Sequence, residues 1–208
     1  MNFLAIDTSG NYMTVVAVKD GEAFSCFLPD CSMRHSVSLM GAVEDALQKA
    51  SLALEDCDFF AAVVGAGSFT GIRIGISAAK GFALAVGKPT LPVTSFGVAA
   101  YNAVNGGKTL CLVDAMHGSY YACGYENGGI VYPPSYLTEA EVLSLKTDGY
   151  ALCSCEDLTL GGEKVERRDP VLGLEKAVKA LAEKGEFGDL IALYVRKSSA
   201  ELNAEKGV

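Results

Sequence analysis

Residues 3–21 and 110–128 carry the same pattern of strands and turns in the same register. Each stretch begins with a short apolar run that ends in an aspartate, Asp7 in the first copy and Asp114 in the second. A turn containing glycine, a second strand-like run and a closing Asp-Gly or Asn-Gly pair follow in both copies. Short apolar runs between such turns are typical of strands, and the closing pairs are typical of hairpins. The repeat therefore predicts two halves that are built alike.

This layout resembles the fold shared by actin, Hsp70 chaperones and sugar kinases, in which two ribonuclease-H-like halves direct aspartates toward a nucleotide and its metal. The resemblance implies an α/β protein with an actin-like, duplicated fold and two adjacent domains. Turn residues cluster without an apolar pattern at Asn105-Gly106-Gly107, which favours a boundary there. We expect an N-terminal actin-like domain over 1–107 and a smaller C-terminal one over 108–208, whose last segment is able to pack back on the first.

The spacing of apolar residues predicts the remaining elements. In the first half we expect strands at about 2–7, 13–18, 22–28 and 59–65, and helices at about 34–50, 70–86 and 95–104. In the second half the three strands recur, Pro133-Pro134 ends the third, and Thr138 with Glu141 opens a helix as a capping box. A strand at about 150–154, a polar loop, a helix at about 171–184 and a strand-like segment at 190–195 follow.

Composition and charge indicate a cytoplasmic protein that does not bind nucleic acid by itself. The formal net charge of −8 argues against a large phosphate-binding surface, so we expect any contact with a nucleic acid to be made through a partner. Seven cysteines are an odd number, and several fall in strand patterns, which indicates reduced thiols. No secretory signal pattern opens the chain, and the apolar segment 72–87 contains Arg73 and Lys80, so we expect no membrane span.

The helix expected at 70–86 has two apolar faces where a surface helix usually has one. One face is polar: Thr70, Arg73, Ser77 and Lys80. A second is suited to the core: Ile72, Ile76, Ala79, Ala83 and Val86. A third holds small and apolar residues: Gly71, Gly75, Ala78 and Phe82. Either this helix is buried between its own sheet and a neighbouring helix, or part of its surface packs on another protein chain. In the second case the amphipathic helix at 34–50 contributes Leu39, Val43, Ala46 and Leu47.

A glycine-rich turn joins the strand at 59–65 to this helix. It contains the residues Gly65, Gly67, Ser68, Phe69, Thr70, Gly71, Arg73 and Gly75. Ser68 or Thr70 can cap the exposed N–H groups of the helix, and such a turn can hold an anion. The full string resembles the G-x-G-S-F-T-G-hydrophobic-R-hydrophobic-G signature of the TsaB (YeaZ) family, which is related to the TsaD/Kae1/Gcp glycoprotease-like proteins.

Four further segments are similar to that family. They are the opening strand that ends in Ile6-Asp7-Thr8, the pair His35-Ser36, the run Val113-Asp114-Ala115 followed by Gly118 and Tyr121, and the closing Tyr194-Val195-Arg196. The resemblance implies a non-catalytic subunit that binds a TsaD-like transferase, which forms N6-threonylcarbamoyladenosine at position 37 of tRNAs reading codons that begin with A. It also implies a TsaE-like ATPase in the complex, ATP/ADP and metal bound by the partner subunits, and a homodimer in isolation through the two N-domain helices.

Two alternatives are enzymes. An independent actin-like ATPase or small-molecule kinase would use a set of candidate nucleotide or anion contacts: Asp7, Thr8, Ser9, Gly67, Ser68, Thr70 and Asp114. The second half shows no second phosphate loop, and an aspartate at a strand end is also a common turn cap. A metallopeptidase would need ligands on one helix face, but His35 and His117 have no spaced histidine partner. We therefore expect no metal site and no catalytic residue in this chain.

Overall fold

The structure is a computed structural model that describes residues 1–101 and 107–196. Its first half is a five-stranded sheet of order β3-β2-β1-β4-β5. The strands are β1 (Phe3–Asp7), β2 (Met13–Lys19), β3 (Glu22–Leu28), β4 (Phe59–Val63) and β5 (Thr90–Val93). The helices are α1 (His35–Ala50), η1 (Leu54–Asp56), α2 (Phe69–Val86) and α3 (Ser95–Tyr101). The predicted boundary at Asn105-Gly106 and the end of the helix predicted at 95–104 lie outside the described residues.

The second half is a five-stranded sheet of order β12-β9-β6-β7-β8, with a two-stranded sheet β10-β11 beside it. Its strands are β6 (Lys108–Asp114), β7 (Ser119–Glu126), β8 (Gly129–Thr138), β9 (Tyr150–Ser154), β10 (Thr159–Leu160), β11 (Glu163–Lys164) and β12 (Glu166–Arg167). Its helices are α4 (Glu139–Thr147), which begins with the predicted capping box, and α5 (Pro170–Glu183). The division into domains at 107/108 stays a prediction.

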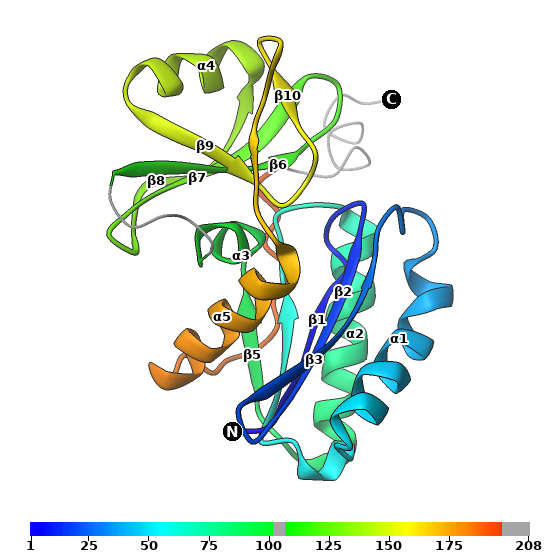
Figure 1. Cartoon of the computed structure of the whole chain (residues 1–208). Helices are drawn as coiled ribbons and strands as arrows, with labels where there is room; N and C mark the ends of the chain where they lie inside the picture. Colours follow the sequence, from blue (N-terminus) through cyan, green and yellow to red (C-terminus); the bar gives the residue numbers. More distant parts are fainter. Residues whose placement is uncertain (102–106, 197–208) are drawn as a thin grey trace, which may run out of the picture.

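The two sheets have the same topology (Figure 1). In each sheet, the first three strands of that half pair antiparallel: β3-β2-β1 in one and β8-β7-β6 in the other. Two further strands then add in parallel, β4-β5 next to β1 and β9-β12 next to β6. Asp7 is the last residue of β1, and Asp114 is the last residue of β6. The α/β class, the duplicated actin-like arrangement and the matching positions of the two aspartates are confirmed.

Three local predictions are wrong. Strand β8 continues through Pro133-Pro134, because it is an edge strand and its pairing with β7 is irregular there, so the missing N–H groups cost no regular ladder bond. The loop after β9 contains β10, β11 and β12. Segment 190–195 forms no strand, although the Leu193 N–H donates to the Val64 carbonyl at 2.7 Å.

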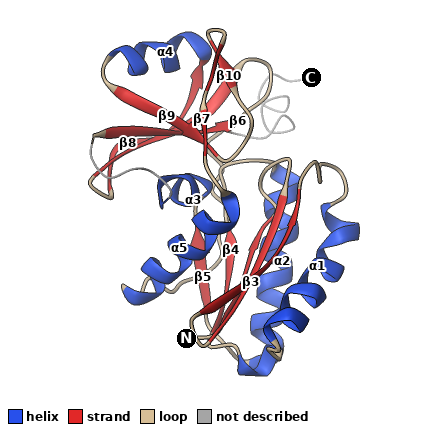
Figure 2. Ribbon diagram, viewed as in Figure 1, coloured by secondary structure: helices blue, strands red, loops and turns tan. Residues whose placement is uncertain are grey.

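Helices α3 and α5 lie between the two sheets, whereas α1 and α2 cover the other face of the first sheet (Figure 2). The last helix of the described residues, α5, therefore packs on the N-terminal sheet. Among the described helices, α2 has the length and the apolar composition that a membrane span needs. It packs on β1 and β4 as a core helix, with Ile72, Ala79 and Ala83 buried.

Candidate functional site

The carboxylate of Asp7 is fully buried and is bound by its own chain. Its Oδ1 accepts hydrogen bonds from the Ser9 N–H at 2.9 Å and the Ser9 hydroxyl at 2.6 Å. Its Oδ2 accepts one from the Tyr12 hydroxyl at 3.2 Å. Burial raises the pKa of Asp7, and the hydrogen bonds from Ser9 and Tyr12 oppose that rise. The hydrogen bonds satisfy both oxygens without a ligand.

A chain of hydrogen bonds links this carboxylate to the glycine-rich turn. The hydroxyls of Ser9 and Ser95 are 3.1 Å apart, and Ser95 donates to the Ala66 carbonyl at 2.5 Å. Thr8 donates to the Gly71 carbonyl at 2.7 Å. The candidate contacts Asp7, Thr8 and Ser9 are thus brought together with the turn, and each of these side chains binds a protein group.

Asp114 differs from Asp7, although the two hold equivalent positions. It is exposed, and its Oδ1 accepts a hydrogen bond from the Met116 N–H at 2.8 Å, so it caps a turn. The buried carboxylate in the second half is Glu156, whose Oε2 accepts from the Asp114 N–H at 2.8 Å. Burial raises the pKa of Glu156, while hydrogen bonds from the backbone of Asp114 and Asn11 oppose that rise.

Glu156 therefore joins the two halves, because Asn11 belongs to the first and Asp114 to the second. The sequence analysis missed both Glu156 and Tyr12. Glu156 follows β9 in a polar stretch and Tyr12 precedes β2, so neither stands in a motif that signals a contact across the interface.

The space between the two halves at this point is very small. A cavity of about 10 Å³ is lined by side chains and backbone from both: Ser9, Gly10, Tyr12, Ser95, Leu112, Val113, Ser154, Cys155 and Glu156. A single buried water needs roughly 10–15 Å³. In this conformation the cavity has no room for a nucleotide.

The glycine-rich turn is shaped by contact with the end of β1. Ser68 is the N-cap of α2, and its hydroxyl accepts a hydrogen bond from the Gly71 N–H at 3.2 Å. Of the two residues predicted as possible caps, Ser68 and Thr70, the structure thus selects Ser68. A Cβ added at Gly75 would lie 2.6 Å from the Thr8 Oγ1, and one added at Gly71 would collide with the Thr8 carbonyl. Both glycines are buried against the end of β1, so at these two positions α2 packs on its own sheet.

Two other residues of the turn motif make a stacked cluster with the C-terminal segment. The rings of Phe69 and Tyr194 are stacked with centroids 4.5 Å apart. The Arg73 guanidinium lies 3.9 Å from the centroid of the Phe69 ring, and its Nε donates to the Tyr194 hydroxyl at 2.9 Å. Phe69 and Arg73 of the motif therefore also hold the C-terminal segment at Tyr194 in place against α2.

A groove separates α1 from α2 on the outside of the first sheet. It has a volume of about 510 Å³ and is lined by both helices: Ser36, Leu39, Met40, Phe69, Thr70, Arg73, Ile74, Ser77 and Ala78. The polar face predicted for α2, with Thr70, Arg73, Ser77 and Lys80, is exposed. Met33, Val37, Met40 and Leu84 are large exposed apolar side chains on or beside the two helices.

Several predicted interface residues instead face the protein's own core. Leu39, Val43 and Ala46 are buried against the first sheet, because they lie on the inner face of α1. Leu47, Ala78 and Phe82 are half-buried, and the Phe82 ring lies 6.0 Å from that of Phe60. Of the predicted set, Ala78 is the residue that lines the groove without being fully covered.

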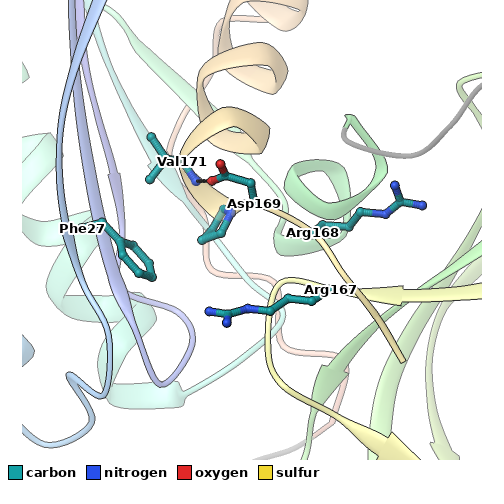
Figure 3. Close-up of a pocket in the computed structure, with 6 residues that line it drawn as sticks. Phe27, Arg167, Arg168, Asp169 and Val171 are labelled. Carbon is teal, nitrogen blue, oxygen red and sulfur yellow. Dashed lines mark hydrogen bonds between the residues drawn. The ribbon is translucent and has the colours of Figure 1, made fainter. Parts of the chain in front are cut away.

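A second cavity, of about 450 Å³, lies between the end of β3 and the start of α5. Figure 3 shows Arg167 and Arg168 pointing in opposite directions beside it, so this basic pair does not form one patch. Arg167 pairs with Asp157 at 3.2 Å, and Asp169 caps α5 by accepting from the Val171 N–H at 2.8 Å.

In residues 1–101 and 107–196, no three or more His, Cys, Asp and Glu side chains are grouped so that they could hold a metal ion. His35 is buried at the start of α1, with its Nε2 3.0 Å from the Tyr12 carbonyl oxygen, and His117 is exposed. The absence of metal ligation in this chain remains a prediction for experiment.

The fold and the duplicated aspartate positions define the class: an actin-like α/β protein of two similar halves. Comparison with known proteins gives the family. A family model described as "TsaD: tRNA N6-adenosine threonylcarbamoyltransferase" matches residues 25–189, which is more than half of the chain.

Two curated relatives carry the name "tRNA threonylcarbamoyladenosine biosynthesis protein TsaB". The Escherichia coli protein is 35% identical over 134 residues, covering 62% of this chain and 58% of the relative. The Bacillus subtilis protein is 30% identical over 131 residues, covering 62% and 57%. The chain thus spans less than two thirds of the length of these relatives.

The structure is also similar to YeaZ of Pseudomonas aeruginosa, with a TM-score of 0.74 at 22% identity over 93% of this chain and 99% of that one. At this identity the likeness concerns the fold alone. The chain belongs to the matched family, as a protein of the TsaB/YeaZ type.

Proposed function

We propose that this protein is a non-catalytic subunit in the biosynthesis of threonylcarbamoyladenosine in tRNA, and that it acts by binding a TsaD-like transferase. The names of the TsaB relatives support the process. The observation that carries the non-catalytic part is the state of Asp7. This carboxylate is buried, its two oxygens are bound by Ser9 and Tyr12, and the adjoining cavity is about 10 Å³.

The groove between α1 and α2 is the surface we propose for the partner. It is the larger of the two open cavities described, and exposed apolar side chains such as Val37, Met40 and Leu84 lie on its two helices. Exposed apolar groups that cluster on a surface favour a protein interface. Arg73, held over the Phe69 ring, adds a cation at the groove that a carboxylate on the partner can pair with.

We further propose that a second copy of the chain occupies the same surface when the transferase is absent. A TsaE-like ATPase would then join the assembly through the transferase. ATP, metal and tRNA would be bound by these partners, which fits the net charge of −8.

The test replaces groove residues with arginine and measures binding to the TsaD-like protein from the same cell. We expect Ala78→Arg and Met40→Arg each to weaken that binding at least about tenfold. The long arginine side chain would occupy the space meant for the partner's apolar side chains, and its charge would be buried without a carboxylate to pair with. Dimer formation should weaken in parallel, and threonylcarbamoyladenosine in tRNA should fall in cells that carry only the variant.

Ala140→Arg is the matched control, because Ala140 is exposed on α4, in the other half of the molecule. It should retain transferase binding and normal tRNA modification. Circular dichroism and thermal melting must show that all three variants fold. If both folded groove variants kept full binding and normal modification, the assignment of the groove to the partner would be incorrect.

A further inference from the structure

Three cysteines lie side by side across the second sheet. Cys123 on β7 and Cys153 on β9 are each the register partner of Cys111 on β6. All three are fully buried in the core between the two sheets. The sulfurs of Cys111 and Cys153 are 3.6 Å apart, whereas the Cys123 sulfur donates to the Tyr132 carbonyl at 3.4 Å. The geometry therefore singles out Cys111 and Cys153 as a thiol pair.

The surroundings of the pair make its two thiols unequal. The pKa of Cys153 is lowered by its hydrogen bond to Cys111 and then by the positive charge of the Arg168 guanidinium. Burial opposes this, and so does the Glu166 carboxylate, which pairs with Arg168 at 2.7 Å. The same hydrogen bond and burial raise the pKa of Cys111. A thiolate beside arginine is the reactive form of cysteine, and a neighbouring thiol can resolve its oxidation product.

We propose that Cys111 and Cys153 form a site of reversible oxidation, at which a hydroperoxide converts the two thiols into a disulfide that links β6 to β9. Neither the proposed partner role nor the family signature involves these residues. Facing residues on neighbouring strands are about 4.8 Å apart, within the range of about 4.4–6.8 Å between Cα atoms that a disulfide spans. Closing the bond needs the sulfurs to approach to about 2.05 Å, which side-chain rotation can supply.

The reaction proceeds in two balanced steps. The Cys153 thiolate attacks one oxygen of hydrogen peroxide, a sulfur–oxygen bond forms, the oxygen–oxygen bond breaks, and hydroxide leaves to take up a proton as water. The Cys111 sulfur then attacks the sulfenic acid of Cys153, and the second water leaves with the Cys111 proton. In total the two thiols lose two electrons and two protons, and one peroxide becomes two waters.

In this proposal, peroxide reaches the buried pair through local opening at the edge of the sheet. The strand that covers β9 is β12, which has only the two residues Glu166 and Arg167, and Glu166 is the register partner of Cys153. Arg168 follows directly and lines the cavity of about 450 Å³ at the start of α5. Opening of so short an edge strand costs far less than global unfolding.

The test treats the native full-length protein with hydrogen peroxide, blocks the remaining thiols after denaturation and maps the peptides by mass. We expect a loss of two hydrogens, one disulfide between the peptides containing Cys111 and Cys153, and full recovery with dithiothreitol. Oxidation of this pair should be at least about tenfold faster than that of Cys57 in the same sample, since thiolate, not thiol, reacts. Cys57 is the matched comparison because it is also buried and its pKa is raised to about 11 by burial.

Alanine variants then test whether the disulfide needs Cys111 and Cys153 and no other cysteine. Cys153→Ala and Cys111→Ala should each abolish the disulfide, while Cys123→Ala and Cys57→Ala should leave it unchanged. The wild-type peptide map decides the question even if a variant does not fold. A native protein that forms no disulfide, that forms one only after unfolding, or that links Cys111 to Cys123 would overturn the proposal.

Discussion

Asp7 lies where a related nucleotide-binding fold would need a free, ionised carboxylate. Here the side chain is fully buried and hydrogen-bonded by Ser9 and Tyr12. Such a group is costly to ionise, because burial disfavours the charged form more than these hydrogen bonds favour it. At the residue scale, Asp7 therefore acts as a structural group that holds the turn between β1 and β2 through Ser9 and Tyr12.

The raised pKa of Asp7 predicts how stability depends on pH. With a folded-state pKa above the unfolded value, the carboxyl stabilises the fold below that unfolded value, and this contribution is lost as pH rises through the folded-state pKa. We therefore expect the stability of Asp7→Asn relative to wild type to increase from about pH 4 toward neutral pH, since Asn is never ionised. Urea unfolding at both pH values measures the difference.

Asp30→Asn, at an exposed carboxylate, is the matched control for this measurement. The explanation fails if Asp7→Asn becomes less stable relative to wild type as pH rises. That result would mean that the ionised carboxylate strengthens the fold through its bonds to Ser9 and Tyr12.

At the scale of the element, helix α2 contributes one side to the core and the other to the groove. Its inner side, with Ile72 and Ala79, fills the core, and Gly71 and Gly75 let the end of β1 approach closely. Its outer side, with Arg73 and Ser77, lines the groove. Periodicity alone assigns Gly75 to a third face, but the side chain of Thr8 occupies that space.

Two glycines on α2 give a matched prediction. We expect Gly75→Ala to destabilise the protein by about 1–3 kcal/mol, because the new methyl would lie 2.6 Å from the Thr8 hydroxyl and overpack the site. Gly81→Ala should stabilise it by about 0.5–1 kcal/mol, because Gly81 is exposed with no atom within 4 Å of the added carbon. Thermal or urea unfolding of both variants checks the sign, and equal effects would show that Thr8 yields to the methyl.

At the scale of the whole molecule, two similar halves meet at one hydrogen-bonded carboxylate, that of Glu156. Glu156 accepts from the backbone of both halves, and Ser95 links the start of α3 to the glycine-rich turn. Helix α5 belongs to the second half in sequence but packs on the first sheet. The two halves are thus joined both by Glu156 and by the packing of α5 across them.

This closure predicts weak nucleotide binding by the protein alone. Calorimetry with ATP and Mg²⁺ should give no micromolar affinity, because binding between the halves would have to separate them and break the bonds that Glu156 accepts from both. Asp7→Ala should leave the result unchanged. Tight ATP binding that Asp7→Ala abolishes would instead favour the kinase or ATPase hypothesis over the role as a partner subunit.

The sequence by itself determined the duplicated α/β fold, the positions of Asp7 and Asp114, the Ser68 cap and the capping box of α4. These features depend on the local periodicity of apolar residues and on which residues can form turns and helix caps, and both are set by residues a few positions apart. Only the tertiary structure decided that Asp7 is satisfied internally, that Glu156 bridges the halves, and that Gly75 faces Thr8. The contacts of Glu156 and Gly75 join segments far apart in the chain, and no local pattern specifies which distant group will fill a given space. The partners of Asp7 are its near neighbours Ser9 and Tyr12, but only packing in the folded protein buries the group.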